Sequence, residues 1–185
     1  MKTLSTLEEI RDYRYKHTEY QLIIDTNILL LFLIGIYDQN YLKNCSLLKE
    51  NGKNYNINHF NLLKNILDIF LNKLTVTPHI ISEINMLAQK TVDKGRKIAY
   101  IESIIKTLKK CDECHIEFNK IAQNNDVVEF GFADISLIES AHQSNYILLT
   151  DERDLYFKFY ESIPIIYFSS IITTDLYKIQ PVLSK

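Results

Sequence analysis

Four carboxylates stand at positions where the surrounding sequence is apolar, which is an unusual place for an ionised side chain. They are Asp25, Glu83, Asp134 and Asp151. Two of them directly follow short apolar runs, and the other two have apolar neighbours three or four positions away, the spacing of one helix face. The only basic residue placed locally is Arg153, beside Asp151. A buried carboxylate is costly unless it is protonated, paired or bound to a cation, so the set predicts a cation site.

The chemistry of such a site follows from its oxygen ligands. Carboxylates suit Mg²⁺ or Mn²⁺, whereas zinc prefers histidine and cysteine. A divalent cation held by carboxylates polarises a phosphate oxygen and lowers the pKa of a bound water, which is the chemistry of phosphodiester hydrolysis. Each acid taken alone is better explained as a helix cap or as a paired core residue. The site interpretation depends on all four occurring together.

The elements that would position these acids alternate along the chain. Helices are expected at about 6–17, 28–36, 58–72, 79–89, 94–110 and 132–142, and strands at 21–24, 74–77, 146–149 and 163–168, with an extended segment at 115–118. We expect a capping box at Ser5 to open the first helix and Gly35 to close the second. This alternation predicts an α/β fold with a mainly parallel sheet, in which Asp25 and Asp151 follow the carboxyl ends of two strands.

The motifs around the acids resemble those of the PIN-domain nucleases between about residues 21 and 168. The matching segments, in chain order, are Ile23-Ile24-Asp25-Thr26-Asn27, Thr77-Pro78-His79-Ile80-Ile81-Ser82-Glu83, Gly131-Phe132-Ala133-Asp134 and Leu148-Leu149-Thr150-Asp151-Glu152-Arg153-Asp154-Leu155. The resemblance implies a three-layer α/β/α sandwich with a central, mainly parallel sheet and an acidic pocket. It also implies an endoribonuclease that uses Mg²⁺ or Mn²⁺ and leaves 5′-phosphate and 3′-hydroxyl ends.

The resemblance also assigns roles by position. Asp25, Glu83 and Asp134 match the first three acids of the family, as catalytic and metal-binding residues. Asp151 is taken as the fourth acid, with Glu152 and Asp154 as alternatives, because the last acid of the family is loosely placed. Asn27 and Thr150 match small polar residues that support the acids.

The resemblance implies one nuclease domain over residues 21–170. The chain adds an N-terminal helical extension at 1–20, an insertion at about 37–73 and a C-terminal segment at 171–185. Expected partners are an RNA substrate, an antitoxin protein if the chain is the toxin of a toxin–antitoxin pair, and a second copy in a homodimer. Two alternatives stay open: a processing or defence nuclease without an antitoxin, and a catalytically silent PIN-like module that binds RNA or protein.

Composition limits the remaining classes of protein. The chain has 185 residues and three cysteines, and its net charge is -2. The longest apolar tract, 28–34, is far shorter than the ~20 residues that span a bilayer, and no secretory signal is evident. We therefore expect a soluble cytoplasmic protein without a membrane segment. Without the four candidate acids the rest of the chain carries +2, which is compatible with an RNA substrate.

Two further patterns carry weaker predictions. Cys111, Cys114 and His115 have the spacing of half a zinc site, but a structural zinc needs four ligands, so we interpret them as ordinary thiols and a histidine. The segment 90–110 is rich in lysine. It is either a solvated helix face or a ridge that follows the phosphates of a nucleic acid.

Overall fold

The centre of the protein is a five-stranded sheet in which all strands are parallel. The structure is a computed structural model that describes residues 4–44, 55–71, 73–91 and 94–176. Its strands are β1 (Gln21–Ile24), β2 (Leu74–Val76), β3 (Asp112–Glu113), β4 (Tyr146–Thr150) and β5 (Ile165–Tyr167), in the order β3-β2-β1-β4-β5. The predicted parallel sheet is therefore confirmed, with β1 in the middle.

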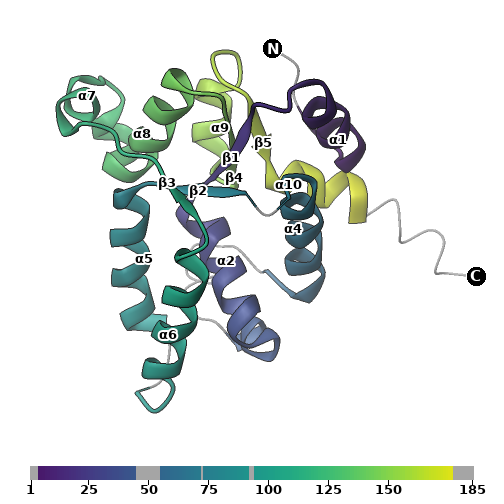
Figure 1. Ribbon diagram of the computed structural model, residues 1–185, viewed down its shortest axis with the longest axis vertical. Coiled ribbons are helices and arrows are strands. Elements are labelled where there is room, and N and C mark those ends of the chain that lie inside the picture. Colours follow the sequence, from purple (N-terminus) through teal and green to yellow (C-terminus); the bar gives the residue numbers. More distant parts are fainter. Residues whose placement is uncertain (1–3, 45–54, 72, 92–93, 177–185) are drawn as a thin grey trace, which may run out of the picture.

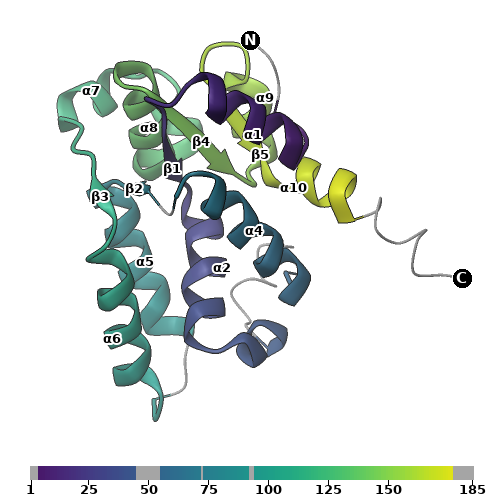
Figure 2. The ribbon, with the colours of Figure 1, turned by 45° about the vertical axis from the view of Figure 1, so that its right-hand side comes forward.

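Helices cover both faces of this sheet. They are α1 (Leu7–Lys16), α2 (Thr26–Tyr37), α4 (Ile57–Ile69), α5 (Pro78–Thr91), α6 (Lys97–Leu108), α7 (Phe118–Gln123), α8 (Val127–Gln143), α9 (Arg153–Phe159) and α10 (Phe168–Ile171), with a 3₁₀ segment η1 (Gln39–Asn44) and a π-helical segment η2 (Ile172–Leu176). In Figures 1 and 2, α2, α4, α5 and α6 lie on one side of the strands, and α8 and α9 lie on the other. This is the predicted three-layer α/β/α sandwich. The chain adds strands on one side of β1 as far as β3 and then on the other side as far as β5, so right-handed crossovers place helices on both faces of the sheet.

The two central strands are apolar because both of their faces are covered. Leu22, Ile23 and Ile24 of β1 and residues 147–149 of β4 have no measurable solvent exposure. A strand buried on both sides reads as a continuous hydrophobic run rather than an alternating one. That property makes both strands recognisable in the sequence, within one residue of their observed ends.

The N-terminal extension is part of the core. Leu4 is buried and forms a parallel bridge with Ile166, the middle residue of β5. The backbone N–H of Leu7 donates to a carboxylate oxygen of Asp175 at 3.0 Å. The following helix, α1, lies against α4, as Figure 2 shows. The N-terminal extension therefore packs against both the insertion and the C-terminal segment.

The insertion predicted at 37–73 also contributes to the core. Its second half forms α4, which buries Phe60, Leu63 and Ile66. Residues 45–54 and 72 of this insertion lie outside the described residues, as do residues 177–185 of the predicted C-terminal segment.

Gly35 does not end a helix, contrary to expectation. It lies inside α2, which continues to Tyr37. A Cβ atom at Gly35 would come within 2.2 Å of the Phe60 ring, so the glycine permits α2 and α4 to approach closely. Its role is packing across two helices.

Other differences concern element boundaries. The cap of α1 is Thr6, whose side chain accepts from the N–H of Glu9, rather than Ser5. The strand near the extended segment expected at 115–118 is the exposed pair Asp112–Glu113, and α7 already begins at Phe118. Helix α7 is absent from the sequence prediction, and α8 begins at Val127 rather than at residue 132. Among the residues that the structure describes, no helix combines the length and apolar character needed to cross a membrane.

Candidate active site

The predicted site lies where the connections of the sheet diverge. From β1 the chain proceeds to β2 on one side, whereas β4 pairs with the other side of β1. The carboxyl ends of β1 and β4 therefore lie at the topological switch point, the usual ligand position in an open parallel sheet. Asp25 directly follows β1, and Thr150 is the last residue of β4.

Asp25 is held rigidly at this point. It is 1% exposed and caps α2, with Oδ1 accepting from the N–H of Ile28 at 2.8 Å. Its Oδ2 accepts from the hydroxyl of Thr150 and from the N–H of Asp151 at 2.9 Å. Burial raises the pKa of Asp25 to about 6, although these hydrogen bonds favour the ionised form. The capping interpretation is correct for Asp25, which also lies at the switch point of the sheet.

Glu83 is brought to the site by α5. Thr77 follows β2 and accepts from the N–H of Ile80 at 3.3 Å, and Pro78 occupies the first helical position, where its missing N–H costs nothing. About one and a half turns later, Glu83 accepts a hydrogen bond from the hydroxyl of Thr26, the first residue of α2. Thr26 thus orients Glu83 toward the end of β1.

Asp134 enters the site because α8 is broken before it. Gly131 has φ 81° and ψ 174°, a conformation that side chains with a Cβ rarely adopt. The second part of α8 starts after this glycine, so Asp134 lies in its first turn. Burial, and then the charges of Asp25, Glu152 and Glu83 in that order, together raise the pKa of Asp134 to about 7.

Asp151, the residue taken as the fourth acid, has both carboxylate oxygens occupied by other parts of the protein. It is 1% exposed, and Oδ2 accepts from the hydroxyl of Tyr55. Its Oδ1 accepts from the N–H of Ser169 at 2.8 Å and from the Ser169 hydroxyl. This pattern ties the loop after β4 to residues that precede α4 and begin α10. The carboxylate of Asp151 thus joins three separate segments of the chain.

Glu152, one of the two alternatives, lies with the other acids. Its carboxylate accepts from the side-chain amide of Asn27, and its charge raises the pKa of both Asp25 and Asp134. The other alternative, Asp154, is exposed in the first turn of α9. The structure therefore brings together Asp25, Glu83, Asp134 and Glu152, and both predicted supporting residues take part: Asn27 holds Glu152 and Thr150 holds Asp25.

No basic side chain in the described ranges forms an ion pair with these four acids. The ion pairs there are His17–Glu19, Arg96–Asp38 and Lys158 with Asp126 and Glu129. The acids are thus clustered and desolvated without a cationic partner. In the same part of the chain no three His, Cys, Asp or Glu side chains already stand in an arrangement that could hold a metal ion.

Several residues of the site carry no signal in the sequence. Tyr55 and Ser169 lie far from Asp151 in the chain and have no motif around them, so their hydrogen bonds were not foreseen. Thr26 belongs to a recognised segment, but its contact with Glu83 depends on how α2 and α5 pack. The positive φ of Gly131 is the one feature with a usable signal, because a glycine before an apolar helical run favours a break.

The cysteine pair and the lysine-rich segment singled out in the sequence have contacts that do not involve the four acids. Cys111 and Cys114 have different partners, with Sγ of Cys111 toward the carbonyl of Thr107 at 3.7 Å and Sγ of Cys114 toward Ser140 Oγ at 3.5 Å. In the lysine-rich segment, Arg96 pairs with Asp38 at 3.6 Å, so part of its charge is already neutralised.

Comparison of the chain with protein-family models, with curated proteins and with solved structures finds no match.

Proposed function

We propose that this protein is a Mg²⁺- or Mn²⁺-dependent endoribonuclease that hydrolyses RNA phosphodiester bonds. The observation that carries the proposal is the environment of Asp134, whose pKa is raised by burial and by three further carboxylates from separate elements. Such a cluster is electrostatically unfavourable in isolation. A hard divalent cation relieves that repulsion and takes oxygen ligands, so this donor set fits Mg²⁺ or Mn²⁺.

The roles of the acids follow from their contacts. Asp25, Asp134 and Glu152 would hold the cation, with Asp25 fixed by Thr150 and Glu152 fixed by Asn27. We place Glu152 rather than Asp151 among the ligands, because the charge of Glu152 acts on both Asp25 and Asp134, whereas Asp151 is bound to Tyr55 and Ser169. The bound cation supplies charge stabilisation at the phosphate and acidifies a water molecule.

Glu83 has a separate task in this proposal. The hydroxyl of Thr26 orients one oxygen of its carboxylate, and the other oxygen is available to position the attacking water and to accept its proton. Attack on phosphorus breaks the bond to the 3′ oxygen, which leaves a 5′-phosphate and a 3′-hydroxyl. The resemblance implies the same products.

An exposed aromatic pair favours a single-stranded substrate. Phe118 and Phe132 are 57% and 54% exposed, and their ring centroids lie 5.5 Å apart in an edge-to-face arrangement. Phe132 lies two residues before Asp134 in the helical segment after Gly131, but side chains two residues apart on a helix point to different faces. A strand bound at the acids would therefore reach this pair by extending beyond them. Unpaired bases stack on exposed aromatic rings, at about 1–3 kcal/mol per base. We therefore expect Phe132→Ala to raise KM more than it lowers kcat.

The test is cleavage of a labelled single-stranded RNA by the purified protein, with Mg²⁺, with Mn²⁺ and with EDTA. Asp25→Asn and Asp134→Asn should each lower the rate by at least about a hundredfold, since each removes a cation ligand. Asp154→Asn is the matched control, because it removes an exposed carboxylate from the same surface. The product ends are then mapped. Activity that survives both substitutions and the chelator contradicts the proposal.

The biological setting is tested separately from the chemistry. If the chain is a toxin, its expression should arrest bacterial growth, and Asp134→Asn should abolish the arrest. An antitoxin and a homodimeric state remain predictions from the resemblance. Cleavage without growth arrest would favour a processing or defence nuclease. Metal-independent RNA binding without cleavage would favour the silent module.

A further inference from the structure

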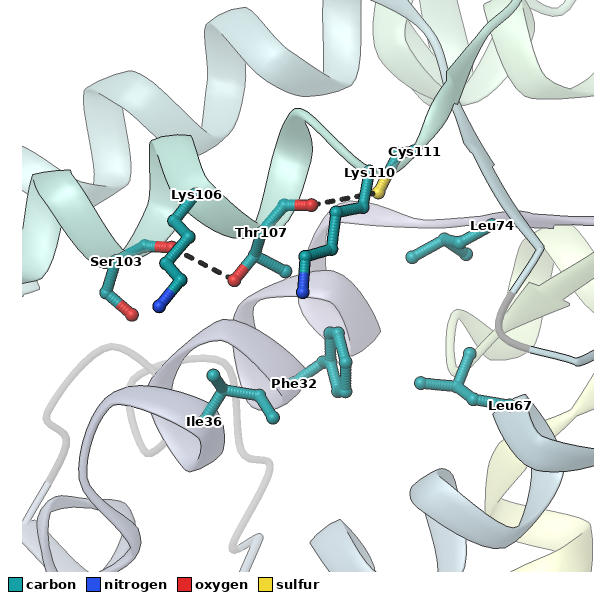
Figure 3. Close-up of a pocket in the computed structure, with 9 residues that line it drawn as sticks. All are labelled: Phe32, Ile36, Leu67, Leu74, Ser103, Lys106, Thr107, Lys110 and Cys111. Atoms are coloured by element: carbon teal, nitrogen blue, oxygen red, sulfur yellow. Dashed lines mark hydrogen bonds between the residues drawn. The ribbon is translucent and has the colours of Figure 1, made fainter.

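A cavity of about 550 Å³ opens between α2, α4, α6 and the start of β2. Figure 3 shows the nine residues around it, which are Phe32, Ile36, Leu67, Leu74, Ser103, Lys106, Thr107, Lys110 and Cys111. The volume is within the range of small-molecule sites, about 300–1,000 Å³. Phe32 lies seven residues beyond Asp25 along α2, or about 10 Å of helix, so this cavity is separate from the acids.

The cavity has an apolar side and a cationic side. Phe32, Ile36 and the two leucines form the apolar side, and Ile36 is 47% exposed, whereas the three residues before it in α2 are buried. Opposite them, Lys106 lies in the last turn of α6 and Lys110 lies just beyond its end, and both extend toward the apolar side chains, as Figure 3 shows. Both ammonium groups therefore border the same cavity.

The positive charge of this cavity is not neutralised by its own walls. Its lining includes two lysines and no acidic side chain, and within the described part of the chain neither lysine has a carboxylate within 4 Å. Burial raises the pKa of Cys111 to about 11, so its thiol stays neutral and brings no negative charge. The Thr107 hydroxyl is committed to the carbonyl of Ser103 at 2.9 Å. An anionic ligand group is the missing complement to this pair of lysines.

We propose that this cavity binds a small amphipathic organic anion, with its apolar body against Phe32, Ile36 and Leu67 and its anionic head between Lys106 and Lys110. Charge complementarity selects an anion over a neutral lipid, and the concave apolar side selects an apolar body over a bare phosphate. The inference does not depend on the proposed nuclease activity. It also gives these two lysines a role other than the phosphate ridge considered from the sequence.

The experiment titrates the full-length protein with 8-anilinonaphthalene-1-sulfonate, an amphipathic aromatic anion that fluoresces in apolar sites. The variant is Lys106→Gln with Lys110→Gln. The matched control is Lys94→Gln with Lys109→Gln, which removes the same charge from exposed lysines outside the cavity. Decanoate and decanol then compete for the bound probe, because they share an apolar chain and differ in charge. Circular dichroism verifies that each variant is folded.

We expect saturable binding of the probe, a Kd about tenfold higher in the cavity variant, and less than a twofold change in the control, since each partly exposed ion pair contributes a several-fold effect. Decanoate should displace the probe at least tenfold better than decanol. Asp134→Asn should bind the probe normally, which separates this cavity from the acids. Equal affinity in the two lysine variants, or equal competition by decanol, overturns the inference. The inference is also overturned if single-stranded RNA displaces the probe from the wild type but not from the Lys106→Gln, Lys110→Gln variant. In that case the two lysines contact a phosphate backbone.

Discussion

Asp134→Asn is expected to stabilise the cation-free protein at alkaline pH, although Asp134 is partly buried and belongs to the site. The carboxyl pKa is 3.8 in an unstructured chain and about 7 in the folded protein, where burial and neighbouring carboxylates disfavour its charge. A group whose pKa rises on folding holds its proton more tightly in the native state. Its contribution to stability is therefore complete below pH 4 and is lost as the pH rises through 7.

The size of the effect follows from these two pKa values. Relative to low pH, the linkage relation gives a loss in the free energy of unfolding of about 4 kcal/mol at pH 8 and about 1.7 kcal/mol at pH 5. Well below pH 4 the loss is almost zero. Asparagine has nearly the shape of the protonated acid and cannot ionise, so the variant avoids this loss. Because the acids titrate as an interacting set, we expect an observed gain of about 2–4 kcal/mol at pH 8.

The assay is urea unfolding followed by circular dichroism at pH 5 and pH 8, in EDTA and then in Mg²⁺. In EDTA the free energy of unfolding of the variant should exceed that of the wild type, and the difference should be larger at pH 8 than at pH 5. Mg²⁺ should then stabilise the wild type, by about 2.7 kcal/mol at one hundred times its Kd, and leave the variant nearly unchanged. Asp154→Asn serves as the control and should stay within about 0.5 kcal/mol at both pH values.

Two results would refute this reasoning. If Asp134→Asn lowers the free energy of unfolding at pH 8 in EDTA, the native carboxylate is stabilised by a partner rather than strained by its neighbours. If Mg²⁺ raises the stability of the variant as much as that of the wild type, Asp134 is not a ligand of the cation.

Three other substitutions test the framework around the acids. Gly131→Ala forces a side chain into a backbone conformation at φ 81°, so urea unfolding should show a loss of about 1–3 kcal/mol, and cleavage should fall as the adjoining turn shifts. Tyr55→Phe removes the hydroxyl that donates to buried Asp151 and should cost about 1–3 kcal/mol; an unchanged Tm would show that this hydrogen bond contributes nothing. Gly35→Ala places a Cβ against the ring of Phe60 and should cost about 1–3 kcal/mol, and adding Phe60→Leu should recover part of the loss if overpacking is the cause.

The sheet was predictable because its central strands are buried on both faces. A short, continuous apolar run ending in a polar residue identifies β1 and β4 without any long-range information. Asp25, Glu83 and Asp134 could be chosen for a similar reason. An acid that interrupts an apolar run or helix face is a local anomaly.

The remaining features depend on contacts between distant segments. Asp151 and Glu152 are adjacent, and which of them turns toward the acids is decided by Tyr55 and Ser169, which bind Asp151 from elsewhere in the chain. The prediction that Gly35 ends a helix is wrong because a helix-ending glycine and a close-packing glycine have the same local sequence. Only the position of Phe60 distinguishes them.

The pairing of β1 with β4 has a consequence for the order in which the protein acquires its chemistry. Asp25 emerges early during synthesis, yet its partners Thr150 and Asp151 follow 125 and 126 residues later. Closing so long a loop is slow compared with forming a local helix, and this places assembly of the acids late in folding. A nascent chain that has not yet reached β4 therefore lacks Glu152 and the anchors of Asp25. If the protein cleaves RNA, this topology keeps the nascent chain inactive until translation has passed Glu152.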